Sequence, residues 1–137
     1  MPKYGTRSAE RLSTCHKGIQ RLFNRVVEDF DCSVLEGHRG EARQNQLFNE
    51  GKSKLEYPHG KHNRKPSEAI DVAPYPIDWD DLNRFYYFAG YVKALANEMG
   101  LKIRWGGDWD GDTILDDQTF MDLPHFDIRS RSWHSEM

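Results

Sequence analysis

The chain has 137 residues, of which 37% are hydrophobic and 30% charged, and its formal net charge is −3. This length fits one domain that buries about two-thirds of its unfolded surface, and we predict a single domain over residues 1–137. The negative charge argues against a general nucleic-acid binder, because phosphate contacts need clustered lysine and arginine. The one short basic cluster, residues 61–65, is typical of a solvated loop.

Cysteine use and hydropathy favour a protein made in the cytoplasm. Cys15 and Cys32 are the only cysteines and lack metal-ligand spacing, which favours reduced thiols. The N-terminal segment contains no apolar stretch of signal-peptide length. No window approaches the roughly 18 apolar residues needed to span a membrane. We therefore expect no membrane insertion and no export by a signal peptide.

Three helices are predicted from spacing and end signals. Apolar residues three and four apart predict a first helix from a cap at Ser8 through Phe30. A short second helix is expected over residues 41–49. The longest helix is predicted to begin at a cap at Asp78 and to end at Gly100.

Four short strands alternate with these helices. Because side chains alternate across a strand, Ile70 and Val72 should face one way and Asp71 the other, beside two small alanines. The same alternation in the last strand places His125 and Asp127 together on one face. The predicted strands cover residues 32–36, 69–73, 101–105 and 124–128.

Asp71 needs a positive partner, because a carboxylate in an apolar strand is costly without an arginine, a lysine or a metal ion. If the strands of Asp71 and His125 are neighbours, the two side chains converge, and His62 can supply a third ligand from the preceding loop. Two histidines and a carboxylate with an open fourth position are the common catalytic zinc arrangement. The alternative is a salt-bridged Asp71 and a His125 satisfied within the core.

Asp122 stands three residues before His125, where the chain enters the last strand. A carboxylate beside a zinc-bound water can take its proton and pass it to a leaving amine, since zinc lowers the pKa of that water to about 7. The alternative interpretation is an exposed aspartate in a turn. Asp127, which shares the face of His125, could orient a ligand histidine.

The motifs together resemble the zinc peptidases of peptidoglycan. This family includes the D-Ala-D-Ala carboxypeptidases and dipeptidases of the VanY and VanX type, and phage endolysins that cut the L-alanyl–D-glutamate bond. The resemblance covers residues 4–128, and its motifs are jointly specific. The segments that match, in the family's order, are GHRGEARQNQLFNEGKS, KHNRKPSEAIDVAPYPIDW, RWGGDWD and DLPHFD.

The resemblance implies roles for individual residues. Asp122 takes the position of the catalytic acid/base, and Arg39 that of an arginine that polarises the scissile carbonyl or stabilises the oxyanion. Gln44 matches a glutamine near that arginine, so Arg39 and Gln44 are the expected substrate-binding residues. The implied zinc ligands are His62, Asp71 and His125.

One loop departs from the family pattern Ser-x-His-x-x-Gly-x-Ala-x-Asp. Gly60 stands at the serine position, Ser67 stands at the glycine position, and two extra residues separate His62 from Ala69. His59 is the only nearby alternative ligand. We prefer His62, because Lys-His-Asn precedes the insertion as the family's histidine does.

A second ion is suggested by the acidic loop after the third strand. Asp108, Asp110 and Asp112 alternate as at the start of a calcium loop, but the glycine at the sixth position and a closing glutamate are missing. Some phage members of the resembling family are regulated by calcium nearby, which makes calcium a candidate. A solvated acidic turn is the favoured interpretation.

The sequence thus predicts an α+β fold, a small and mainly antiparallel sheet with helices on one face and a zinc cleft on the other. The resemblance implies that this fold is of the Hedgehog/DD-peptidase-like kind. The resemblance implies a zinc-dependent peptidase of peptidoglycan stem peptides, an L-alanyl–D-glutamate endopeptidase that serves as a phage endolysin. The alternatives are a D-alanyl–D-alanine carboxypeptidase and an inactive wall-binding module. We expect a monomer in the host cytoplasm that reaches the wall after membrane permeabilisation, with a frayed tail over residues 129–137.

Overall fold

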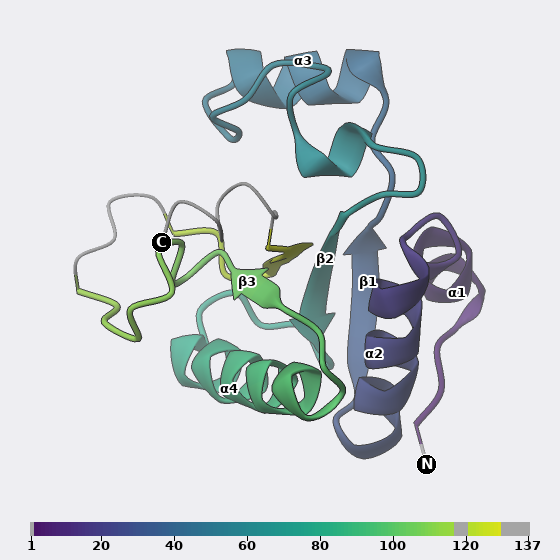
Figure 1. Ribbon diagram of the computed structural model, residues 1–137, viewed down its shortest axis with the longest axis vertical. Helices are drawn as coiled ribbons and strands as arrows, with labels where there is room; N and C mark the ends of the chain where they lie inside the picture. Colours follow the sequence, from purple (N-terminus) through teal and green to yellow (C-terminus); the bar gives the residue numbers. More distant parts are fainter. Residues whose placement is uncertain (1, 117–120, 130–137) are drawn as a thin grey trace.

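The computed structural model describes residues 2–116 and 121–129. These residues form a four-stranded sheet with the strand order β1-β2-β4-β3, in which every neighbouring pair is antiparallel (Figure 1). The predicted α+β fold with a small antiparallel sheet is therefore confirmed. The strands are β1 (Cys32–Glu36), β2 (Ala69–Pro74), β3 (Ile103–Trp105) and β4 (His125–Ile128).

Helices pack against one face of the sheet and enclose the core. Figure 1 shows α1 (Thr6–Leu12) and α2 (Lys17–Asp29) beside β1, with α4 (Leu82–Glu98) next to them. Burial of each large apolar side chain contributes roughly 1.5–3 kcal/mol. The sheet residues in this core are the ones that alternation assigned to the apolar face, and they include Ile70, Val72 and Phe126.

The opposite face of the sheet is bordered by a separate segment. Figure 1 shows α3 (Glu41–Asn49) and the 3-10 helix η1 (Lys61–Asn63) apart from the other helices, beyond the ends of β1 and β2. The predicted bounds of the 41–49 helix are confirmed. This segment forms one wall of the cleft described below.

The prediction of one continuous helix from Ser8 to Phe30 was wrong. Two helices, α1 and α2, occupy this stretch, and His16 caps the second of them. The Nδ1 atom of His16 accepts a hydrogen bond from the backbone N–H of Gly18 at 3.0 Å. The apolar spacing continues across the break, so periodicity alone does not reveal it.

Ser67, which lies in a distant loop, docks at the break between α1 and α2. The backbone of Cys15 forms a parallel bridge with Ser67. The N–H of His16 donates to the Ser67 carbonyl at 2.8 Å, and the N–H of Ser67 donates to the Thr14 carbonyl at 2.9 Å. These long-range bonds replace helical ones. They fix the end of the loop that leads into β2.

The longest helix begins later than predicted. Asp81, rather than Asp78, is its N-cap, and the Asp81 carboxylate accepts from the N–H of Arg84 at 3.2 Å. Gly100 follows the helix with a φ of +77°, a conformation that favours glycine. Within residues 2–116 and 121–129, no helix has the length and apolarity required to cross a membrane.

Candidate metal centre and active site

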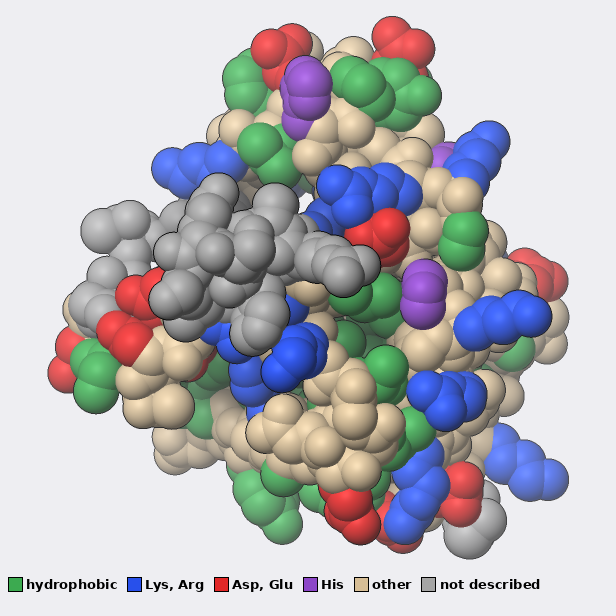
Figure 2. Space-filling view, viewed as in Figure 1, with side chains coloured by type: hydrophobic (Ala, Val, Ile, Leu, Met, Phe, Trp, Pro, Cys, Tyr) green, Lys and Arg blue, Asp and Glu red, His purple; other side chains and the backbone are tan. Residues whose placement is uncertain are grey.

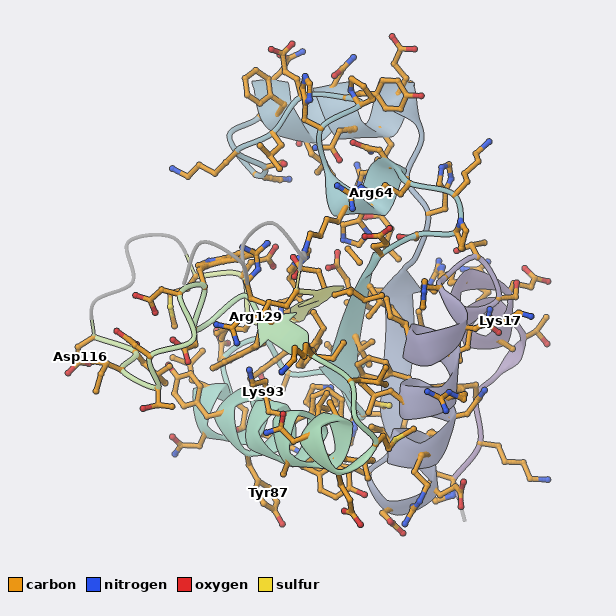
Figure 3. All side chains as sticks on the ribbon, in the orientation of Figure 1. Lys17, Arg64, Tyr87, Lys93, Asp116 and Arg129 are labelled. Atoms are coloured by element: carbon orange, nitrogen blue, oxygen red, sulfur yellow. The ribbon has the colours of Figure 1, made fainter. Side chains whose placement is uncertain are left out.

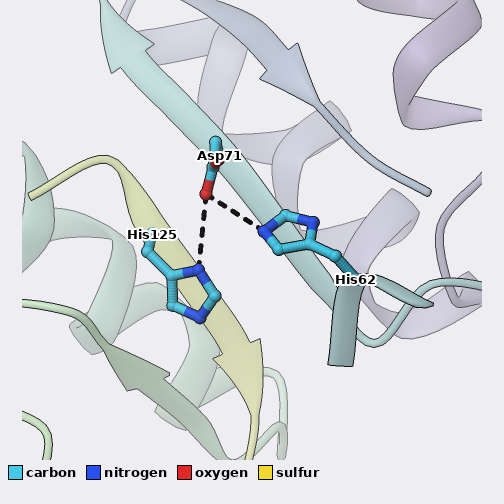
Figure 4. Close-up of side chains that lie close together, drawn as sticks. All are labelled: His62, Asp71 and His125. Atoms are coloured by element: carbon cyan, nitrogen blue, oxygen red, sulfur yellow. Dashed lines mark hydrogen bonds and ion pairs between the residues drawn. The ribbon is translucent and has the colours of Figure 1, made fainter. Parts of the chain in front are cut away.

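Three side chains that are far apart in the sequence converge at one point (Figure 4). Asp71 of β2 pairs with His125 of β4 in the sheet register, so both project from the same face, and His62 approaches from η1. Asp71 Oδ1 lies 3.2 Å from His62 Nε2 and 3.4 Å from His125 Nδ1. One ligand atom from each residue lies within 4.8 Å of the others, so the group could hold a metal ion.

The two extra residues between His62 and Ala69 do not displace His62 from the site. The loop closes on itself through the N–H of Glu68, which donates to the Lys61 carbonyl at 3.1 Å. His62 is buried at 3% exposure, whereas His59 is exposed and does not belong to the group. The structure therefore brings His62, and not His59, to Asp71.

Each histidine is oriented by a partner behind it. The Nδ1 atom of His62 lies 2.7 Å from the carbonyl oxygen of Gly37, which can only accept, so this nitrogen carries a proton. The Nε2 atom of His125 lies 2.8 Å from the carboxylate of Asp127 and donates to it. The nitrogens that face Asp71 are thereby the ones available to a cation. The predicted contact between Asp127 and His125 is confirmed.

The charges of Asp71, His62 and His125 act strongly on one another. Burial alone would raise the pKa of Asp71, but His62 and His125 outweigh it and hold this pKa well below its ordinary value. Burial disfavours a charged His125, yet the carboxylates of Asp127 and Asp71 raise its pKa to about 9. A carboxylate between two imidazoles therefore forms a strongly polarised site that a cation would suit.

Asp127 is itself held by two cations. Its carboxylate accepts from Arg104 Nε at 3.0 Å and from Arg104 Nη2 at 2.7 Å, and the Lys61 ammonium lies 3.6 Å away. Burial would raise the pKa of Asp127, but His125 and Arg104 lower it to about 2. Asp127 is thus stabilised as an anion, and its contact with Nε2 fixes the orientation of His125.

Arg39 lies beside Asp71, at the base of the cleft. Its Nε and Nη2 atoms donate to Glu36 Oε1 at 3.0 and 2.6 Å, and Nη2 lies 3.5 Å from Asp71 Oδ2. Glu36 was not among the site residues predicted from the sequence. A β-bulge between Val34 and Glu36 turns Glu36 to the face of Asp71, and strand alternation does not reveal a bulge.

Gln44 holds Arg39 in place from the other side. Its Oε1 atom accepts from Arg39 Nη1 at 3.0 Å and from Asn63 Nδ2 at 3.2 Å. Its Nε2 atom donates to Ser53 Oγ at 2.9 Å and to the Leu55 carbonyl at 2.5 Å. All hydrogen-bonding capacity of this buried amide is used within the protein. A direct contact of Gln44 with substrate stays a prediction.

Asp122 lines the same cleft as His62 and His125. Its N–H donates to the Gly106 carbonyl at 2.8 Å, and the N–H of Gly106 donates to the His125 carbonyl at 2.8 Å. Burial raises the pKa of Asp122, the charge of Asp71 raises it further, and the nearby cations only partly oppose this. A carboxylate with a raised pKa is a stronger proton acceptor than an ordinary aspartate.

The cleft has a volume of about 400 Å³ and lies between the α3 segment and the sheet. Trp109 lines it, with its ring 5.1 Å from the His125 ring and 4.9 Å below the Arg104 guanidinium. Trp109 and Arg104 lie in the segment RWGGDWD that carries the resemblance, but no role was predicted for either residue, because their importance depends on long-range contacts. The cleft side of the sheet is thus polar and faces away from the helical core.

The acidic loop also forms a compact group. Oxygens of Asp108, Asp110 and Asp112 lie within 4.8 Å of one another. Asp108 Oδ2 accepts from the N–H of Thr113 at 3.0 Å, and the buried Oδ1 atom has no hydrogen-bond partner within the part of the chain that the structure describes. Calcium binding by this loop stays a prediction.

A sheet that presents two histidines and a carboxylate in a cleft, with an arginine and a second carboxylate beside them, is the arrangement of a metallopeptidase. The family model described as phage L-alanyl-D-glutamate peptidase matches residues 1–129. The chain belongs to this family.

Two relatives show the extent of the similarity. The L-alanyl-D-glutamate peptidase of Escherichia phage T5 is 33% identical over 112 residues, which cover 78% of this chain and 81% of that protein. The crystal structure of the L-Ala D-Glu endopeptidase ChiX of Serratia marcescens matches with a TM-score of 0.76 at 27% identity. That match covers 96% of this chain and 93% of ChiX.

Proposed function

We propose that this chain is a zinc-dependent L-alanyl–D-glutamate endopeptidase that cleaves peptidoglycan stem peptides as a phage endolysin. The proposal rests on one observation above all: His62, Asp71 and His125 converge in a cleft that Asp122 also lines. Membership of the peptidase family supports the same activity.

The donor set supports zinc as the ion. It consists of two imidazole nitrogens, whose orientation is fixed by Gly37 and Asp127, and one carboxylate oxygen. Zinc accepts this set and keeps one position open for catalysis. Zinc bound there would polarise the scissile carbonyl and make a water molecule more acidic.

Asp122 is the proposed acid/base. Its raised pKa lets it accept a proton from the attacking water and then give that proton to the amine of the D-glutamyl residue that leaves. Asp122 must be ionised to accept this proton. The positive groups around it, which include Arg39, favour its ionised form because they oppose the rise in its pKa.

Arg39 is proposed to stabilise the oxyanion that develops on the scissile carbonyl. Within the described part of the chain, its hydrogen bonds use Nε, Nη2 and one hydrogen of Nη1, which leaves the second Nη1 hydrogen for a substrate oxygen. Because Glu36 and Gln44 hold the guanidinium, its donors are fixed before substrate arrives, as electrostatic stabilisation requires. Gln44 supports catalysis through Arg39.

Product analysis tests the proposal directly. Digestion of purified peptidoglycan should yield fragments with a new amino terminus on D-glutamate, identified by mass spectrometry. Release of D-alanine would instead support the D-alanyl–D-alanine carboxypeptidase, which the family match disfavours. Binding to the wall without any new terminus would support an inactive wall-binding module. The monomeric state and the location in the host cytoplasm before lysis stay predictions.

Gly106 should be required for catalysis because it holds Asp122. A Cβ atom at Gly106 would overlap the backbone oxygen of Asp122 and lie 3.0 Å from its Cβ atom, so Gly106→Ala must change the position of Asp122 relative to Gly106. We expect kcat to fall about 100-fold, as for catalytic groups misplaced by about 1 Å. Steady-state kinetics with zinc analysis measures the effect, and bound zinc should be retained.

Gly90→Ala is the matched control. Gly90 lies on the exposed side of α4 and nothing lies within 4 Å of an added Cβ atom. This variant should keep its activity and gain up to about 1 kcal/mol of stability, because alanine favours a helix over glycine. Unchanged kcat in a folded Gly106→Ala protein would contradict the positioning role of Gly106.

A further inference from the structure

The cleft is basic although the protein is acidic. Five of its lining residues are lysine or arginine and two, Asp122 and Asp127, are acidic, whereas the whole chain has a net charge of −3. On the face shown in Figure 2, lysine and arginine side chains are spread over the surface and acidic side chains lie among them. A cleft of this charge attracts an anionic ligand.

Two of these cations, Arg104 and Lys61, share one carboxylate. Both contact Asp127, which leaves their small cluster with more positive than negative charge. The Lys61 ammonium also donates to the carbonyl of Ile128. Arg104 and Lys61 are therefore held in place by a single carboxylate, which balances only one of their two positive charges.

The Arg104 guanidinium has a donor to spare. Within the described part of the chain, its hydrogen bonds to side chains use Nε and Nη2, both directed to Asp127, and leave Nη1 available. The guanidinium of Arg104 lies over the ring of Trp109, with Cζ 4.9 Å from the ring centroid. The side chain is 27% exposed and lines the cleft. A fixed guanidinium edge of this kind suits a carboxylate.

The position of this cluster suits the residue next to the scissile bond. Arg104 pairs with Asp127 in the sheet, and Asp127 is two residues from His125 on the same face of β4. Two residues of a strand span about 7 Å. Backbone geometry places a carboxylate of the residue after a scissile peptide bond roughly 4–6 Å from the reacting carbon. The difference between these two distances is shorter than an arginine side chain, so Arg104 can reach the carboxylate.

The chemistry of the proposed substrate supplies such a group. A glutamyl residue has two carboxyl groups, and continuation of the peptide uses only one of them. An L-alanyl–D-glutamyl bond is therefore always followed by a further carboxyl group, which is charged unless it has been amidated.

We propose that Arg104 and Lys61 form a subsite for the free carboxylate of the D-glutamyl residue, and that this subsite selects the carboxylate over its amide. The inference rests on the proposed function, since it concerns the leaving side of the same cleft. Arg104 would bind the carboxylate through Nη1 while its other donors hold Asp127.

Two synthetic stem peptides that differ only at this carboxyl group, free in one and amidated in the other, test the subsite. For the zinc-loaded wild-type protein, kcat/KM should be about 10- to 100-fold higher with the carboxylate, as expected for a charge-assisted hydrogen bond. Arg104→Gln should bring this ratio close to one, and Arg104→Lys should keep part of it. The ratio does not depend on the concentration of active protein, so partial misfolding leaves it unchanged.

Lys52→Gln is the matched control, because Lys52 also lines the cleft but pairs with Glu50 at 3.3 Å and is 69% exposed. Its ratio should equal that of the wild type. A wild-type ratio near one, or a full preference retained by Arg104→Gln, would overturn the subsite. Failure of the wild type to cleave either peptide would instead overturn the proposed function.

Discussion

Replacement of Asp122 by alanine should abolish peptidoglycan hydrolysis and leave the metal in place. Asp122 lines the cleft but does not belong to the group that could hold the ion, so its removal takes away the proton acceptor and not a ligand. General acid–base groups contribute about 10²- to 10⁴-fold to rate, and we expect kcat to fall by that factor. Turbidity loss of isolated cell walls gives the rate, and elemental analysis gives the zinc content.

Asp116→Ala serves as the control for this variant. Asp116 is exposed at the outer edge of the molecule (Figure 3) and is absent from the cleft lining. Its removal changes the net charge by the same amount, so any general effect of charge on wall binding appears in both variants. Wall lysis at the wild-type rate by Asp122→Ala would mean that another group is the base.

The second large effect is expected from His62→Ala, which should bind zinc at least about 100-fold more weakly than the wild type. Loss even of the partner behind a ligand typically costs about 10- to 100-fold in metal affinity, and loss of the ligand itself should cost more. Hydrolysis should fall to background at zinc concentrations that saturate the wild type. Calorimetric titration of zinc into the metal-free protein measures the change.

His59→Ala provides a matched control three residues earlier in the same loop. His59 is exposed and outside the convergent group, so its removal should change neither zinc affinity nor hydrolysis. If the His59 variant lost zinc and the His62 variant kept it, the ligand assignment would have to be exchanged between the two residues.

The faces of the strands could be predicted because alternation is a local property of the chain. Ile70 and Phe126 reach the core, and Asp71 and His125 reach the cleft, as their positions in the sequence indicated. Asp71 and His125 were predicted to converge only if their strands are neighbours, and β2 and β4 are neighbours in the sheet.

Features that depend on distant parts of the chain could not be predicted. The break before His16 exists because Ser67 docks there, and the sequence between the two helices shows no stop signal strong enough to reveal it. Glu36 reaches Arg39 only through a bulge, and Arg104 reaches Asp127 only through strand pairing. Of the supporting contacts, the one between Asp127 and His125 was predicted, whereas those of Glu36 and Arg104 were missed. The central residues came from strand alternation and from motifs.

The docking of Ser67 between α1 and α2 links the metal group to the stability of the whole fold. The loop that connects His62 to Asp71 is fastened to a helix junction whose flanking residues, Leu12, Cys15 and Ile19, belong to the hydrophobic core. Asp71 and His125 are held together by the sheet, and the docking of Ser67 limits how far the loop can carry His62 away from them. An ion that binds the native group more tightly than the unfolded chain therefore stabilises the N-terminal helices, and a weakened core lowers the affinity for the ion by the same coupling free energy.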